Sequence, residues 1–241
     1  MAGNKKYRNE LKFILSPIWA EILKHRLSFV MDIDENATNK DNTYLVRSLY
    51  FDDFENSAYY DKITGEKSRY KYRIRIYNLD HGVIKLERKE KERNLIHKKA
   101  MTISEDVYNE IVSGNINLEL TKNDDLLAEF IRDMETKDLR PSVIVNYKRL
   151  AYTYPAEDTR VTFDEGVASG RFDYNLFSKD ILLYDILNSN ETIIEVKFNN
   201  GIPSHIASIL NSIPTIRQAV SKYTICYEKK EAVINELFRY N

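Results

Sequence analysis

The chain has 241 residues, 43% of them hydrophobic, so it has enough apolar side chains for a sizeable globular core. Its 36 basic and 37 acidic side chains nearly cancel, which excludes a generally basic nucleic-acid-binding protein. Its single cysteine, Cys226, excludes an internal disulfide and a cysteine-based metal centre. The sequence shows neither a signal-peptide pattern nor a long apolar run, so we expect a cytoplasmic protein without a membrane segment.

The predicted elements alternate between strands and helices along the whole chain. The first half predicts, in order, a strand over 7–15, a helix begun by Ser16 and Pro17, a polar loop over 32–42, a strand over 44–51, a short helix near residue 58, and strands over 69–77, 83–90 and 96–103. The second half predicts helices over 105–111 and 126–134, strands over 142–152, 160–164 and 192–198, a helix over 203–210, a last strand ending at 227 and a helix over 228–240. No linker divides this order, so we expect one domain over residues 1–241, an antiparallel sheet of about eight strands with helices outside it.

The strand over 69–77 alternates strictly between cations and apolar residues. One face carries Arg69, Lys71, Arg73 and Arg75. Successive cations on that face lie about 6.5–7 Å apart, with no acidic residue between them, so they repel one another unless they are solvated or neutralised. For this strand taken alone, water is the favoured partner of the cations.

Other strands repeat this habit of carrying charge on one face. The additional charged positions are Arg8, Glu10, Lys12, Lys85, Glu87, Lys89, Lys98, Arg149, Arg160, Asp164, Glu195 and Lys197. Any single residue could be a solvated side chain or a surface ion pair of little value. The set as a whole favours a barrel whose outer face packs on helices and whose lumen holds the charges and a polyanion. The carboxylates among the cations, Glu10, Glu87 and Glu195, suggest Mg²⁺ or Mn²⁺ bound together with phosphate oxygens.

Nine short motifs follow one another in a fixed order. They are Glu10-x-Lys12, Ser48-Leu49-Tyr50-Phe51-Asp52, Lys71-x-Arg73-x-Arg75, Leu86-Glu87-Arg88-Lys89, Lys98, Tyr147-x-Arg149-x-Ala151, Arg160-Val161-Thr162-Phe163-Asp164, Glu195-Val196-Lys197 and Ser221-Lys222-Tyr223. From about residue 7 to residue 227 this order resembles the VTC domain, the polyphosphate polymerase branch of the triphosphate tunnel metalloenzymes, a CYTH-like superfamily.

The resemblance implies an α+β fold, an eight-stranded antiparallel β-barrel tunnel with helices packed outside. It also implies an ATP-dependent polyphosphate polymerase, which moves the γ-phosphate of ATP or another nucleoside triphosphate to a growing polyphosphate chain with Mn²⁺ or Mg²⁺. The implied partners are therefore the nucleotide and polyphosphate or pyrophosphate, and no nucleic acid. The implied catalytic, phosphate-binding residues are Lys12, Arg73, Arg75, Lys89, Lys98, Arg149, Arg160, Lys197 and Lys222. Further substrate-binding residues would be Lys71, Lys85 and Tyr147, and Glu195 would be the leading metal ligand, ahead of Glu10 and Glu87.

One position departs from the wider superfamily, which often opens with Glu-x-Glu-x-Lys. Arg8 stands where the first glutamate would be. This disfavours a CYTH-type triphosphatase or cyclase and suits the polymerase branch. Two alternatives stay open, because each needs the same cationic lumen: an inorganic triphosphatase of the same fold, and a non-catalytic module that binds polyphosphate or nucleotide.

Overall fold

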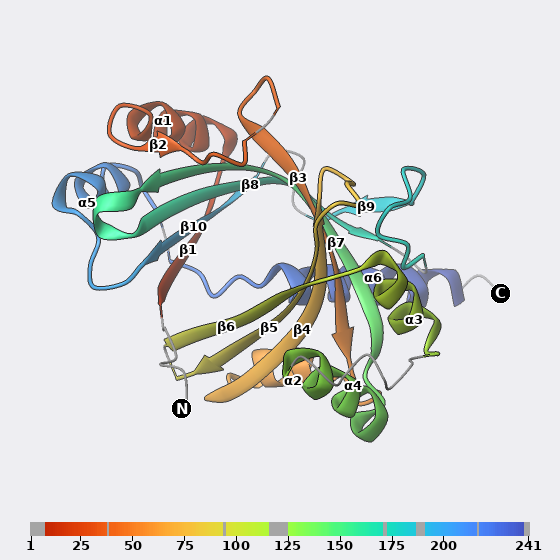
Figure 1. The fold of residues 1–241 in the computed structure, drawn as a ribbon. Coiled ribbons are helices and arrows are strands. Elements are labelled where there is room, and N and C mark those ends of the chain that lie inside the picture. The colour runs from red at the N-terminus through yellow and green to blue at the C-terminus, as the bar shows by residue number, and fades with distance from the viewer. Residues whose placement is uncertain are drawn as a thin grey trace.

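The computed structural model describes residues 8–37, 39–93, 95–115, 125–170, 173–186, 191–215 and 217–238 (Figure 1). The predicted first strand and last helix include Tyr7 and Tyr240, which lie outside these residues. Within the described ranges, no helix combines the length and the apolar character that crossing a lipid bilayer requires.

The described strands form one antiparallel sheet. They are β1 (Asn9–Leu15), β2 (Asp32–Ile33), β3 (Thr43–Asp52), β4 (Ser68–Tyr77), β5 (Ile84–Glu92), β6 (Leu95–Ile103), β7 (Arg140–Tyr154), β8 (Thr159–Gly170), β9 (Leu183–Asp185) and β10 (Thr192–Phe198). The main path runs β1-β10-β8-β7-β3-β4-β5-β6, with β2 added to β7 and β9 added to β8. Its eight strands correspond to the predicted ones, and the α+β class is confirmed. The short β2 falls in a segment predicted to be a loop.

Helices α1, α3, α4 and α5 cover the outer face of this curved sheet. The described helices are α1 (Pro17–Leu27), α2 (Ser57–Thr64), α3 (Glu105–Ser113), α4 (Asp125–Lys137), α5 (Ser204–Asn211) and α6 (Lys222–Phe238). Helices α1 and α5 pack outside one half of the sheet, and α3 and α4 pack outside the other half (Figure 1). The outer layers therefore take up the apolar faces of the strands.

Strand β4 shows why the alternating sequence forms this sheet. Its apolar residues Tyr72, Ile74 and Ile76 are almost completely buried on the outer face, in the same cluster as Phe130 of α4. Successive side chains of a strand point to opposite faces, so the basic residues of β4 point to the concave side. Burial of the apolar face therefore orients the cations inward.

The sheet curves strongly, but it does not close through a continuous ladder. Among the described residues, its edges at β1 and β6 are joined by one isolated bridge, in which the backbone N–H of Arg8, next to β1, donates to the carbonyl of Ile96 at 3.1 Å. Neighbouring strands are rotated by about 20–25° on average, so two edges brought together by curvature meet at an angle. The predicted tunnel is thus a curved sheet whose concave side, here called the lumen, stays open along a seam.

The predicted last strand, ending at Tyr227, is wrong, because α6 already begins at Lys222. This segment is rich in strand-forming residues, yet Tyr223 and Cys226 are buried among Val143 and Val145 of β7 in a third core cluster. Residues three and four apart share one face of a helix, which suits this burial. Helix α6 therefore enters the concave side and brings Lys222 to the lumen.

Candidate active site

Charged side chains of opposite sign face one another across neighbouring strands of the lumen. The directly paired positions are Glu10 with Lys197, Lys12 with Glu195, Arg149 with Asp164, and Arg73 with Glu87. Side chains at directly opposed positions lie within contact distance of each other. The register of the sheet thus sets four of the predicted cations, Lys12, Arg73, Arg149 and Lys197, directly opposite carboxylates.

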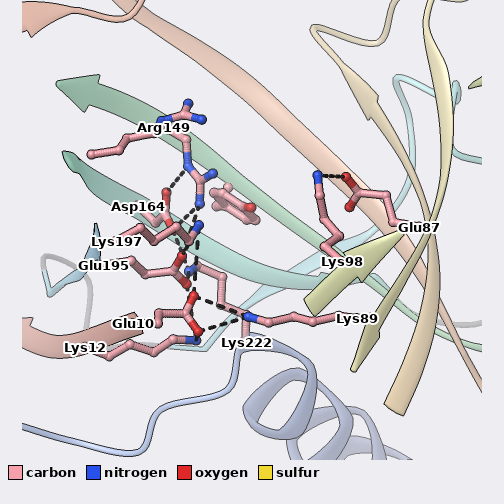
Figure 2. A network of polar contacts seen from close by, with 12 residues as sticks. Glu10, Lys12, Glu87, Lys89, Lys98, Arg149, Asp164, Glu195, Lys197 and Lys222 are labelled. Carbon is pink, nitrogen blue, oxygen red and sulfur yellow. Dashed lines mark hydrogen bonds and ion pairs between the residues drawn. The ribbon is translucent and has the colours of Figure 1, made fainter. Parts of the chain in front are cut away.

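Glu195 is the centre of the largest group of ion pairs (Figure 2). Its carboxylate oxygens lie 2.8 Å from Lys222, 3.1 Å from Lys197, 3.3 Å from Lys12 and 3.9 Å from Arg149, measured to the side-chain nitrogens. Burial would raise the pKa of Glu195, but these cations hold that pKa well below its usual range. Glu195 is therefore a buried anion that contacts several cations at once and offsets part of their charge.

Asp164 holds two of the same cations from β8. It is completely buried and accepts two hydrogen bonds from Arg149, at 2.6 and 2.7 Å, and Lys222 Nζ lies 2.5 Å away. The sequence places Asp164 on the same face as Arg160 but assigns it no role. The alternation of Arg160, Thr162 and Asp164 along the predicted strand was the sequence feature that could have predicted a role for Asp164 in the site. The fork-shaped contact makes Asp164 the residue that orients the Arg149 guanidinium.

Glu10 connects the two sides of the lumen. Its carboxylate lies 3.0 Å from Nζ of Lys89, which comes from β5, and 3.8 and 3.9 Å from Lys12 and Lys197. Burial would raise the pKa of Glu10, but these cations hold it below its usual range. Figure 2 shows Lys89 reaching across to Glu10 from the opposite wall.

A second, separate group of charges surrounds Glu87 on the opposite wall (Figure 2). Glu87 is 1% exposed and lies 2.6 Å from Arg73 Nε, 2.8 Å from Lys98 Nζ and 3.9 Å from Arg75. Although burial raises the pKa of a carboxyl group, Arg73 and Arg75 hold the pKa of Glu87 well below its usual range. The two arginines thus share one buried carboxylate with Lys98, and its single negative charge offsets part of their positive charge.

Hydroxyl groups also hold these two arginines in place. Arg73 donates to the hydroxyl of Tyr50 at 2.8 Å, while Arg75 donates to Ser48 at 3.1 Å and to Tyr147 at 3.3 Å. Tyr147 is one of the predicted substrate-binding residues. Tyr50 and Ser48 belong to one of the nine motifs, but the sequence predicted no role for them in the site. Fixed guanidinium groups need little reorganisation to bind an anion.

An inner cavity of about 60 Å³ lies between the two groups of charges. Its lining includes ten of the predicted site residues, namely Lys12, Lys71, Arg73, Arg75, Lys89, Tyr147, Arg149, Glu195, Lys197 and Lys222. Residues that sequence analysis left unassigned complete the lining: Tyr50, Ser221 and Tyr223. Side chains from both walls and from α6 therefore converge on one small space.

The other predicted site residues lie outside the inner cavity. Glu10 borders a larger cavity of about 570 Å³, here called the outer cavity, and Glu87 and Lys98 form the pair on the wall. Arg160 is held 2.8 Å from Asp34 and donates to Tyr44, and Lys85 lies against the ring of Tyr77. The structure thus gives Arg160 and Lys85 partners away from the inner cavity.

Lys71 differs from the other cations of the inner cavity. Among the described residues no carboxylate forms an ion pair with it, and its Nζ donates to Ser221 Oγ at 3.2 Å. Burial, together with nearby Lys89, Lys12 and Arg73, holds the pKa of Lys71 well below its ordinary value. An anion entering the cavity would reverse this shift, because it would favour the charged amine.

Glu10 and Glu195 are the carboxylates that fit a divalent metal ion. Both lie within 4 Å of the same two ammonium groups, those of Lys12 and Lys197, and both are held in the ionised form. Mg²⁺ is commonly bound through one or two carboxylates plus substrate phosphates, so this pair suits it. Within the described part of the chain, no three carboxylate, imidazole or thiolate side chains form a complete metal site. Glu87, on the other wall, is not part of this pair.

Lys197 gives a prediction about pH. Burial lowers the pKa of Lys197 to about 8, although Glu195 and Glu10 act in the opposite direction. Only the protonated amine attracts phosphate, so tripolyphosphate affinity should fall as the pH rises through 8. Isothermal titration on both sides of that pH measures the fall.

The Lys197→Arg variant is the control for this prediction, because arginine keeps its charge throughout this range. It should show a smaller fall. An equal fall in both proteins would assign the pH dependence to another group.

The effect of Lys197 on the free energy of unfolding has the opposite dependence on pH. The pKa of Lys197 is lower in the folded protein than in the unfolded chain, so between these two pKa values the unfolded chain binds more protons. The free energy of unfolding therefore rises with pH in that range.

Comparisons with known proteins identify the family and the fold of the chain. The family model of the VTC domain matches residues 7–230. A solved structure of an adenylyl cyclase candidate from Hippeastrum, with a dominant triphosphatase activity, has a TM-score of 0.56 at 16% identity, covering 93% of this chain and 96% of its own. An adenylate cyclase candidate from Bacillus halodurans has a TM-score of 0.49 at 15% identity, covering 86% and 88%. No curated protein sequence matches significantly. At such identity, the Hippeastrum structure shows a shared fold.

Proposed function

The chain belongs to the VTC domain family, and we propose that it is an ATP-dependent polyphosphate polymerase. The family and the triphosphate tunnel fold support an activity on triphosphate or polyphosphate groups. The observation that carries the finer proposal is the inner cavity, where cations from both walls and from α6 surround one space. Such an enclosure suits an anion of high charge density.

The cations of the inner cavity would bind and orient the nucleoside triphosphate. Arg73 and Arg75, held by hydroxyl groups, present guanidinium groups that match phosphate oxygens. Lys12, Lys197 and Lys222 would add point charges from the other wall. In the proposed reaction, the bond between the γ-phosphorus and its bridging oxygen breaks. A terminal oxygen of the polyphosphate chain forms the new bond, and the nucleoside diphosphate leaves with the electron pair.

This reaction depends mainly on position and charge. The terminal oxygen of polyphosphate is already anionic at neutral pH, so no strong general base is required, and no covalent protein nucleophile is needed. Glu195 and Glu10 would hold Mn²⁺ or Mg²⁺. A metal ion in that position supplies additional neutralisation of the phosphate oxygens.

An inorganic triphosphatase of the same fold is the second candidate. The Hippeastrum protein, which shares the fold, has a dominant triphosphatase activity. Hydrolysis needs the same cationic cavity, with water in place of the chain terminus as the acceptor. The outer cavity, whose lining includes Lys62, Arg69 and Lys91, supports the polymerase, because it provides room and charge for a longer anion.

The deciding experiment identifies the product made from ATP. Purified protein with ATP and Mn²⁺ or Mg²⁺ should convert the γ-phosphate into acid-insoluble polyphosphate. Gel electrophoresis of the product measures the growth of this chain over time. A surface variant, Lys179→Gln, should behave like the unchanged protein because Lys179 is exposed and outside both cavities. Release of orthophosphate alone would contradict the polymerase and support the triphosphatase. Binding without turnover would indicate a non-catalytic module.

A further inference from the structure

Asp52 is a buried carboxylate at the end of β3 that the proposed reaction does not use. Its residue is 4% exposed and lines neither the inner nor the outer cavity. In the part of the chain that the structure describes, no lysine, arginine or histidine forms an ion pair with it. Burial raises the pKa of Asp52, and the hydrogen bonds that it accepts act against this rise. A buried carboxylate is unfavourable unless hydrogen bonds compensate it, so its donors indicate its role.

Four donors converge on the two carboxylate oxygens of Asp52. Oδ1 accepts hydrogen bonds from the backbone N–H groups of Asp53, at 3.0 Å, and Ala58, at 2.9 Å. Oδ2 accepts from the backbone N–H of Tyr59 at 3.1 Å and from the hydroxyl of Tyr223. Ala58 and Tyr59 lie in the first turn of α2, and Tyr223 lies in the first turn of α6. Asp52 therefore ties the beginnings of two helices to the end of β3.

The hydrogen bond to Tyr223 connects Asp52 with the inner cavity. The ring of Tyr223 lines this cavity and stacks on the ring of Tyr50, with 5.1 Å between the ring centroids. Nζ of Lys71 lies 5.3 Å from the centroid of the Tyr223 ring and 5.6 Å from that of Tyr50. The Tyr50 hydroxyl in turn accepts a hydrogen bond from Arg73. A displaced Tyr223 ring would therefore change the surroundings of two cations of the inner cavity.

The same hydrogen bond holds the first turn of α6. Lys222 precedes Tyr223 in the chain and lies between two carboxylates of the lumen. The following part of α6 is held separately, because Cys226 is packed in the third core cluster and its carbonyl accepts a hydrogen bond from Ser169 at 2.9 Å. Loss of the contact between Tyr223 and Asp52 would thus loosen the first turn, with Lys222, while the rest of the helix stays packed.

We infer that Asp52 is a positioning residue of the candidate active site, which acts through the Tyr223 hydroxyl to hold Lys222 and the aromatic rings beside Lys71 in place for anion binding. Asp52 itself touches no ligand. Its role rests on the proposed function, because the anion concerned is the one bound in the same inner cavity. The sequence places Asp52 at the end of one of the nine motifs and assigns it no role.

A carboxylate is the group that satisfies all four donors. Asparagine has nearly the same shape, but one of its two terminal atoms is an NH₂ group, which donates. In either orientation of the amide, this NH₂ group would face a backbone N–H, that of Tyr59 or those of Asp53 and Ala58. Asp52→Asn therefore disrupts the contacts with almost no change in volume. Tyr223→Phe removes the hydroxyl and keeps the ring.

Isothermal titration with tripolyphosphate tests this role. The Kd should rise about tenfold in Asp52→Asn and in Tyr223→Phe, because each breaks one hydrogen bond to a charged group. The variant with both changes should bind no more than about twofold more weakly than either single variant, since two residues that act through one contact do not have additive effects.

The amine of Lys71 gives a second readout that a loss of stability alone would not change. Burial, followed by the charges of nearby cations, holds the pKa of Lys71 well below its ordinary value. Loosening of the Tyr223 ring would admit water beside this amine, so its pKa should move toward the ordinary value in Asp52→Asn and in Tyr223→Phe. Titration followed by NMR of the lysine side chains in the folded protein measures the shift.

A destabilised variant away from the site is the matched control. Leu127→Ala removes a buried side chain of α4 from the outer cluster, which lines neither cavity. It should lower Tm at least as much as Asp52→Asn, yet leave the Kd and the pKa of Lys71 unchanged. Calorimetry of every variant verifies that it is folded at the temperature of the titration.

Three results would overturn the role of Asp52. An unchanged Kd in both single variants would mean that Asp52 serves the fold alone, and an equal loss of affinity in Leu127→Ala would tie the effect to stability. Additive losses in the double variant would mean that Asp52 acts through α2 instead of Tyr223. If Asp52→Asn fails to fold, the Kd and the pKa of Lys71 in Tyr223→Phe decide. Because binding is measured without turnover, absent polymerase activity would defeat the proposed function and leave this role standing.

Discussion

A Glu195→Gln variant is expected to lose about 10²- to 10³-fold in the turnover of ATP. Glu195 contacts Lys12, Lys197 and Lys222, and glutamine cannot neutralise them. The cations would repel one another and lose the positions from which they bind phosphate, and the proposed metal ion would lose its leading ligand. Steady-state kinetics at saturating ATP measure the effect, and Glu55→Gln, at an exposed position, is the matched control.

The same variant should unfold more easily. Removing one partner of a buried ion pair costs about 3 kcal/mol or more, which for a chain of this size lowers Tm by about 6–12 °C in calorimetry. Since the pKa of Glu195 is lowered in the folded state, its stabilisation is present above the unfolded pKa and is lost as the pH falls below it. The unchanged protein should therefore lose more stability on acidification than the variant. Full activity together with an unchanged Tm would contradict the central role of Glu195.

A second large effect is expected for the combined change Arg73→Ala and Arg75→Ala. Charge-assisted hydrogen bonds contribute about 1.5–3 kcal/mol each, so tripolyphosphate binding should weaken by about 3–6 kcal/mol. Isothermal titration measures the Kd directly. The matched control is Arg26→Ala with Arg140→Ala, two exposed arginines outside both cavities, which should leave the Kd unchanged.

A third substitution separates binding from stability in this pair. Without the two arginines, Glu87 is left buried with Lys98 as its remaining ion-pair partner, so the double variant should be less stable than the unchanged protein. Adding Glu87→Gln removes the poorly compensated charge and should recover part of the lost Tm without recovering ligand affinity. A lower Tm with unchanged affinity would show that Arg73 and Arg75 serve the fold alone.

Local pattern was enough to predict most of the sheet and the face on which its charges lie. The two-residue alternation in β4 places Tyr72, Ile74 and Ile76 on one side and the cations on the other, whatever the strand packs against. Because burial of the apolar side is strongly favoured, the cations had to occupy the opposite, concave face. The assignment of particular residues to the site came instead from the family resemblance, and ten of the residues that it implied line the inner cavity.

Tertiary structure alone decided how these charges are partnered. The sequence shows four cations in a row, whereas the fold sets Glu87 beside Arg73 and brings Lys89 across the lumen to Glu10, 79 positions away in the chain. Such contacts depend on the curvature of the whole sheet, which no local pattern contains. Likewise, the residues from Lys222 to Tyr227 resemble a strand, and they form a helix because Tyr223 and Cys226 find an apolar surface inside the curved sheet. That choice places the Lys222 ammonium group between Asp164 and Glu195.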